Sequence, residues 1–140
     1  MSTKRFMQIF VGCFVIAASF LGFVIEAKAQ MLATSAEEIF GTWVAGSSHY
    51  LRFDQDGTFR GANTLDQLNS LPYSINSYQF NGTKMVITEV WGAIPANTCG
   101  EKIASYEIQL LESGNIRIVV IEDQCQRRAA NIPGEYKPVR

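Results

Sequence analysis

The chain has 140 residues, 47% of them hydrophobic, which suits a domain with an ordinary apolar core. Its 12 Lys and Arg nearly balance its 13 Asp and Glu, giving a net charge of −1. Without a basic stripe, a nucleic-acid-binding protein is not expected.

The first 29 residues have the pattern of a signal peptide. Lys4 and Arg5 precede an almost uninterrupted apolar run, 6–25, and the tripeptide Ala-Lys-Ala at 27–29 is a small-x-small cleavage site. We expect cleavage after residue 29 and export to the periplasm or the medium. The alternative is an uncleaved membrane anchor, because about twenty apolar residues can span a bilayer. The mature chain, 30–140, would hold 9 basic and 12 acidic side chains, a net charge of −3.

Two cysteines remain in the mature chain once Cys13 has left with the signal peptide. In an exported protein, Cys99 and Cys125 most simply form one disulfide, which would stabilise the fold by roughly 2–4 kcal/mol. A metal site is not expected, because the chain has one histidine and no Cys-x-x-Cys.

The mature chain begins with a predicted loose lead, 30–34, and a short helical turn, 35–38. Ser35 and Glu38 have the spacing of a capping box, in which each residue satisfies backbone donors of the first turn. Gly41 would end this turn, and Trp43 would begin the first strand.

The rest of the chain alternates short β-rich runs with turns such as Asp56-Gly57 and Asn81-Gly82, which are typical of hairpins. The connections are too short for parallel crossovers, so we predict an antiparallel meander of eight strands closed into a barrel. A two-sheet sandwich is the alternative. After the strand that begins at Trp43, the predicted strands are 49–53, 58–63, 72–80, 84–91, 103–111, 116–121 and 125–130, with a longer connection over 65–71 and an irregular tail over 131–140.

Gly41-Thr42-Trp43 before a run of short strands, with Arg127 and Arg128 on the predicted last strand, resembles the lipocalin pattern of the calycin superfamily. In that family the Trp plugs the closed end of an eight-stranded up-and-down barrel and an Arg lies across the indole. The resemblance assigns these structural roles to Trp43 and Arg127. It also implies a cup for one small ligand, without naming that ligand.

Alternation along the strands predicts which side chains point inward. The apolar phase gives an interior of Leu51, Phe53, Phe59, Ile75, Met85, Ile87, Trp91, Tyr106, Ile108, Ile118 and Val120. All of these residues except Leu51 and Val120 are predicted to form the walls of the ligand site. The loops 64–71 and 92–102 are predicted to form the open rim of the barrel. The alternative is that they fill the barrel as a solid core.

Glu89 is the sharpest candidate for chemistry, because the same phase places it inside, beside Ile87 and Trp91. A carboxyl group withdrawn from water is suited to general acid or base catalysis. A phase error or a β-bulge would instead place it in solvent. His49 follows the 46–48 turn and is a weaker candidate base, since such a residue is more often simply exposed.

These features favour a binding protein for a small, mostly apolar or aromatic molecule, with no cofactor. The first alternative is a cyclase, isomerase or lyase that uses Glu89 in the same barrel. The second is a periplasmic protease inhibitor whose lead, 30–34, enters the protease cleft. The bacterial metalloprotease inhibitors are similar in size, Gly-x-Trp start and single disulfide, but the cysteines of this chain lie later.

Overall fold

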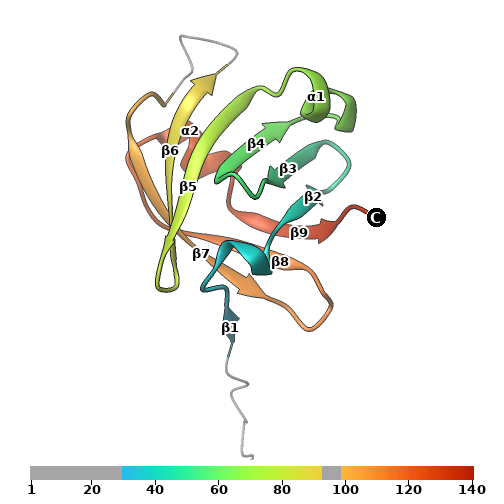
Figure 1. Cartoon of the computed structure of the whole chain (residues 1–140), viewed down its shortest axis with the longest axis vertical. Helices are drawn as coiled ribbons and strands as arrows, with labels where there is room; N and C mark the ends of the chain where they lie inside the picture. The colour runs from blue at the N-terminus through green and yellow to red at the C-terminus, as the bar shows by residue number, and fades with distance from the viewer. Residues whose placement is uncertain (1–29, 93–98) are drawn as a thin grey trace, which may run out of the picture.

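The computed structural model describes residues 30–92 and 99–140, so the predicted signal peptide lies outside the described residues. Each of eight strands pairs antiparallel with the next along the chain, and the last pairs with the first to close a barrel (Figure 1). The predicted up-and-down barrel is therefore confirmed. Its strands are β2 Gly41–Ala45, β3 His49–Phe53, β4 Thr58–Ala62, β5 Ser74–Asn81, β6 Lys84–Gly92, β7 Ile103–Leu110, β8 Ile116–Asp123 and β9 Gly134–Pro138.

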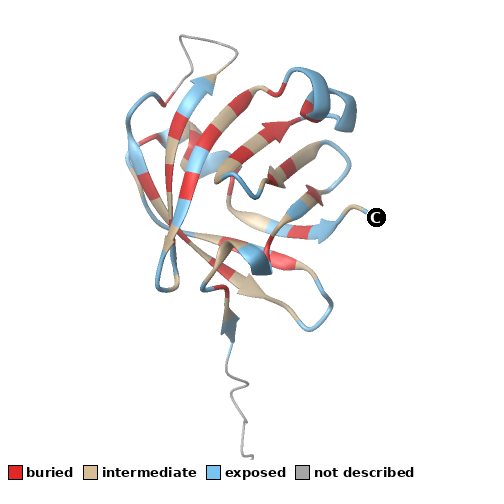
Figure 2. Cartoon of the chain, in the orientation of Figure 1, coloured by how far each residue is buried: buried red, intermediate tan, exposed pale blue. Residues whose placement is uncertain are grey.

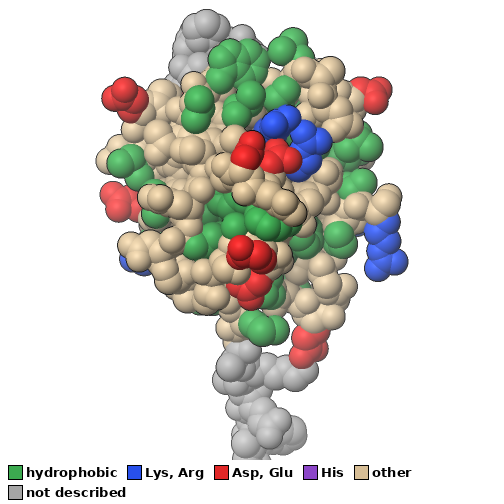
Figure 3. Space-filling view, in the orientation of Figure 1, with side chains coloured by type: hydrophobic (Ala, Val, Ile, Leu, Met, Phe, Trp, Pro, Cys, Tyr) green, Lys and Arg blue, Asp and Glu red, His purple; other side chains and the backbone are tan. Residues whose placement is uncertain are grey.

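The surface of the barrel carries no concentration of one charge on the face drawn in Figure 3, where acidic and basic side chains are scattered among the others. None of the helices in the described ranges is long and apolar enough to cross a membrane.

The segment before the barrel is folded rather than loose, which corrects the predicted lead. Met31 and Leu32 form β1 and pair with the end of β7, and the backbone N–H of Ala33 donates to Ile108 O at 2.8 Å. Ala33 is fully buried, and burial of its methyl group holds this segment against the core.

The predicted helical turn is confirmed as the 3₁₀ helix η1, Ala36–Glu38. The Glu38 carboxylate accepts hydrogen bonds from the backbone N–H groups of Thr34 at 2.7 Å and Ser35 at 3.0 Å. Just beyond it, the Trp43 indole N–H donates to Ile39 O at 2.8 Å. Together these residues fill the end of the barrel that also carries the turn 54–57, called here the η1 end.

The core confirms most of the predicted interior, and Figure 2 shows buried residues recurring along the strands. The rings of Phe53 and Phe59 stack with centroids 4.8 Å apart, and Tyr78 meets Phe53 edge-on at 5.4 Å. The predicted residues that are buried are Leu51, Phe53, Phe59, Met85, Ile87, Tyr106, Ile108 and Ile118.

Ile75, Trp91 and Val120 were predicted to lie inside, and this is wrong. Trp91 is 39% exposed, Val120 is 38% exposed and Ile75 is half-buried. Trp91 and Val120 each lie next to an irregularity in strand pairing. Ile75 pairs with Trp91, whereas the next residue, Asn76, pairs with Glu89. The register between β7 and β8 shifts in the same way between Ser105 and Tyr106. A bulge inserts one residue into a strand, so Trp91, which follows the β6 bulge, leaves the alternation that keeps Glu89 inside. Val120 lies at the edge of the β8 irregularity, and Ile75 lies between the buried Ser74 and Asn76 and so points to the opposite face.

The predicted last strand, 125–130, is also wrong, because residues Gln126–Asn131 form the helix α2. Gln, Arg and Ala are strong helix formers, so propensity favours this outcome. The strand that closes the barrel is β9, within the predicted irregular tail; there Tyr136 is buried and its hydroxyl donates to Ile132 O at 2.8 Å. The predicted connection 65–71 contains the helix α1, Leu65–Ser70, capped by Thr64.

The Cys99–Cys125 disulfide is confirmed. Because Cys125 is the N-cap residue of α2, the bridge joins the loop before β7 to this helix rather than to a strand. It therefore holds α2 against the end of the barrel opposite η1, called here the α2 end (Figure 1).

Candidate functional site: a pocket beneath helix α2

A pocket of about 270 Å³ opens at the α2 end. Strands β3 to β6 supply one side of it and helix α2 supplies the other. Its lining is His49, Leu51, Phe59, Gly61, Asn63, Tyr73, Ser74, Asn76, Glu89, Gly92, Cys99, Arg127, Arg128, Asn131 and Ile132.

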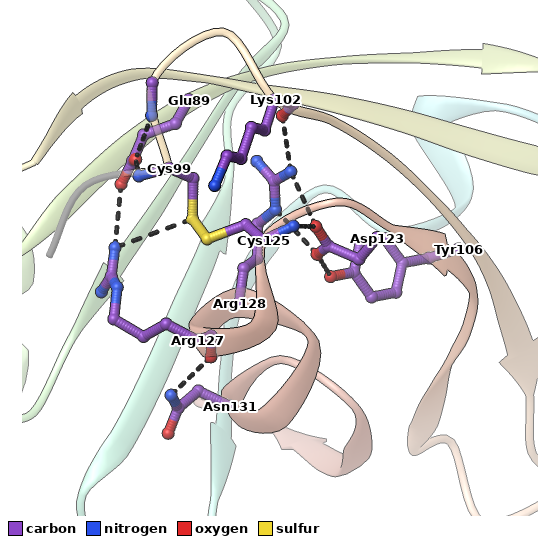
Figure 4. Close-up of a disulfide and its surroundings, with 10 residues drawn as sticks. Glu89, Cys99, Lys102, Tyr106, Asp123, Cys125, Arg127, Arg128 and Asn131 are labelled. Carbon is purple, nitrogen blue, oxygen red and sulfur yellow. Dashed lines mark hydrogen bonds and ion pairs between the residues drawn. A yellow bond between two sulfur atoms is a disulfide. The ribbon is translucent and has the colours of Figure 1, made fainter.

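Glu89 points into the barrel, as predicted, and is 7% exposed. One carboxylate oxygen accepts hydrogen bonds from the backbone N–H groups of Cys99 and of Gly100, the latter at 3.1 Å (Figure 4). The other oxygen accepts from Arg127 Nη2 at 3.2 Å. The β6 bulge follows directly after Glu89, so it keeps this carboxylate inside while Trp91 turns outward.

Arg127 lies on α2 rather than on a strand, and its guanidinium is bound to Glu89 and lies 3.9 Å from Cys99 Sγ. Arg127 was predicted to lie across the Trp43 indole, but its guanidinium pairs with Glu89 at the α2 end, while Trp43 lies at the η1 end and donates to Ile39 O. Within the described ranges, Arg127 Nε has no hydrogen-bond partner.

A buried ion pair between Asp123 and Arg128 anchors α2 to β8. Arg128 donates to both carboxylate oxygens of Asp123, from Nε at 2.8 Å and from Nη2 at 3.0 Å. Arg128 Nη2 also reaches Lys102 O at 2.6 Å, and the Tyr106 hydroxyl donates to Asp123 (Figure 4). The side chains of Arg128 and Asp123 are 4% and 0% exposed.

The protonation of Asp123 follows from these contacts. Burial opposes its ionisation, but the hydrogen bonds from Arg128, from Tyr106 and from the backbone N–H of Cys125 outweigh burial and lower its pKa. Burial, and then the hydrogen bond to Asp123, raise the pKa of Tyr106. The pair is thus ionised at neutral pH beside a neutral tyrosine.

The pairing of Asp123 with Arg128 was not predicted from the sequence. The sequence did contain a signal for this pair: Asp123 precedes Cys125 by two residues and Arg128 by five, and residues 126–130 are strong helix formers. A helix starting at Cys125 brings Arg128 back over Asp123, whereas the predicted strand would separate them.

His49 is half-buried at the start of β3 rather than exposed in the turn. Its Nδ1 lies 3.4 Å from the Tyr73 hydroxyl, and its ring centroid lies 5.8 Å from that of Tyr136. Burial lowers the pKa of His49 below its usual value of about 6.5, so the ring is neutral at pH 7. Burial also raises the pKa of Tyr73 to about 12, so that its hydroxyl keeps its proton.

Gly61 makes room for Tyr73. A Cβ at position 61 would lie 2.9 Å from atoms of the Tyr73 ring, which is closer than van der Waals contact allows. The tyrosine can therefore lie against β4 at the wall of the pocket. Neither residue was singled out in this role from the sequence, because the contact depends on strand register.

The nine residues predicted to form the ligand walls lie in three different environments. Phe59 lines the pocket, whereas Ile75 and Trp91 are partly exposed. The other six belong to the packed core: Phe53, Met85, Ile87, Tyr106, Ile108 and Ile118. The barrel is therefore filled toward the η1 end and hollow toward the α2 end.

Within the described ranges, no three His, Cys, Asp or Glu side chains are grouped so that they could hold a metal ion. The chain matches no protein-family model, and no curated protein or solved structure shows significant similarity to it.

Proposed function

We propose that this protein binds one small, mostly apolar molecule in the pocket beneath α2, and that it does so after export as a member of the calycin superfamily. The observation that carries the proposal is the pocket itself, in a barrel whose remaining interior is packed. A designed cavity of about 150 Å³ takes up benzene, so about 270 Å³ is enough for a one- or two-ring compound.

The lining supports a ligand with an apolar body. Leu51 and Phe59 form the barrel side and Ile132 lies on the opposite side, while polar side chains from α2, the strands and the adjoining loops complete the lining. Apolar walls with a few placed polar groups are typical of small-molecule sites. The disulfide and the Asp123–Arg128 pair hold α2 in place, which lowers the entropy lost when a ligand binds.

The two alternative functions are less well supported. For the protease inhibitor, the lead would have to leave β7 and withdraw Ala33 from the core before it could enter a protease cleft. For the enzyme, Glu89 would have to work as acid or base while three donors hold its two oxygens. Those contacts favour a positioning role for Glu89.

The test is native mass spectrometry of residues 30–140 purified from an exporting host. We expect an adduct of small-molecule mass that is lost on denaturation. Ser74→Leu, which adds side-chain volume at the pocket wall, should abolish the adduct. Ser77→Leu is the matched control, because Ser77 lies on the same strand and is exposed. An adduct retained by Ser74→Leu, or lost equally from both variants, would contradict the proposal.

A further inference from the structure

Two arginines from α2 line the pocket, and each has a nitrogen without a hydrogen-bond partner among the described residues. Arg127 uses Nη2 for Glu89, and its Nε has no partner among the described residues. Arg128 Nη1 likewise lacks a partner in the described part of the chain, although the residue is 95% buried (5% exposed). Both of these nitrogens are enclosed by protein, but the Arg127 side chain as a whole is 38% exposed, so an acceptor in the pocket can reach its guanidinium.

The negative charge that lines the pocket is already paired. Glu89 is its one carboxylate, and both of its oxygens already accept hydrogen bonds. The other acceptors in the lining, such as the Asn76 amide oxygen and a ring nitrogen of His49, are uncharged. A cationic ligand would therefore find no free carboxylate, whereas two guanidinium groups lie in the lining.

The polar and apolar parts of the pocket are separated in space. Both arginines come from α2, whereas Leu51 and Phe59 come from strands β3 and β4. A ligand placed here has its apolar part against the barrel wall and its polar part toward the helix. Figure 4 shows Arg127 reaching from α2 to Glu89 beside the disulfide.

On these grounds, and resting on the function proposed above, we infer that the ligand is a carboxylic acid with a compact aromatic or aliphatic body. Its carboxylate oxygens accept hydrogen bonds from Arg127, whose side chain is 38% exposed. Glu89 then serves to position the Arg127 guanidinium, as Asp123 positions that of Arg128. Charge-assisted hydrogen bonds of this kind are roughly twice as strong as those between neutral groups.

The test compares three probes of equal ring size: 2-naphthoate, 2-naphthamide and 2-naphthylmethylamine, titrated calorimetrically into residues 30–140. We expect naphthoate to bind at least about tenfold more tightly than the amide, and the amine to bind most weakly. Equal binding of naphthoate and the amide, or preference for the amine, would overturn this inference while leaving the binding function intact. No binding of any probe at millimolar concentration would overturn both.

Substitutions test whether the preference for naphthoate comes from Arg127. Arg127→Gln should lower the preference for naphthoate over the amide to less than about threefold. The double variant Glu89→Gln/Arg127→Gln should do the same without leaving a buried carboxylate unpaired, and it separates a lost contact from repulsion by Glu89. Arg117→Gln is the control, since Arg117 pairs with Glu135 on the surface and should leave the preference unchanged. A preference that survives in the double variant would overturn the assignment to Arg127.

Discussion

The two ends of this barrel are closed in different ways. At the η1 end the chain uses apolar side chains, with Ala33, Ile39 and Trp43 packed into the core. At the α2 end it uses a disulfide and two ion pairs, Glu89–Arg127 and Asp123–Arg128, around a pocket. Apolar packing fills space, whereas a covalent bridge and directed hydrogen bonds can hold a helix over an empty volume. Both ends therefore contribute to stability, whereas the ligand site proposed above lies at the α2 end alone.

The largest expected effect is from Arg128→Met, which leaves Asp123 charged and buried without its partner. We expect a loss of about 3–5 kcal/mol in the free energy of unfolding, measured with urea. Arg117→Met removes an arginine from an exposed pair with Glu135 and should cost less than about 1 kcal/mol. Equal losses in the two variants would show that the buried pair does not anchor α2.

Removing the disulfide should have the next largest effect. Cys99→Ser/Cys125→Ser frees α2 from the loop before β7 and should lower the free energy of unfolding by about 2–4 kcal/mol. Because the bridge lies at the pocket, ligand binding should weaken even at temperatures where the variant remains folded. If binding is unaffected in the folded double variant, the bridge contributes stability but does not shape the pocket.

Gly61→Ala should have an intermediate effect concentrated on the pocket. The added methyl group meets the Tyr73 ring, so either β4 or the tyrosine must move, at a cost of about 1–3 kcal/mol. Gly114→Ala is a useful comparison, because position 114 has open space and its cost comes from backbone strain alone. Chemical shifts at His49 and Tyr73 should change in the first variant and not in the second.

Trp43→Phe should have the smallest effect and should separate the two ends most clearly. It removes the hydrogen bond to Ile39 O and part of the apolar plug, which should cost about 1–2 kcal/mol of stability. Ligand affinity, measured by calorimetry, should stay within about twofold of the unchanged protein. A large loss of affinity would mean that the η1 end is coupled to the pocket.

Much of the barrel could be predicted because its signals are local. Turns such as Asp56-Gly57 and Asn81-Gly82, and alternation along 84–89 and 103–110, depend on neighbouring residues and were predicted correctly. Bulges are different, since one inserted residue changes the side on which Trp91 lies without any mark in the sequence.

The pocket was harder to predict, because its lining comes from four strands, a helix and several loops. Residues 125–130 follow a strand-rich region and were assigned to the barrel, although their propensity favours a helix. That one error removed α2 and with it the partners of Glu89 and Asp123. Strand β9, rich in Gly, Lys, Glu and Pro, has weak β propensity and forms because it closes the ring between β2 and β8.

The most direct test of this asymmetry is a two-dimensional NMR titration of residues 30–140 with 2-naphthoate. We expect the perturbed signals to come from His49, Tyr73, Arg127 and Ile132 at the α2 end, with Trp43 and Ile39 at the η1 end unchanged. Perturbations centred on Trp43, or spread evenly over the outer surface of the barrel, would contradict the assignment of binding to the pocket beneath α2.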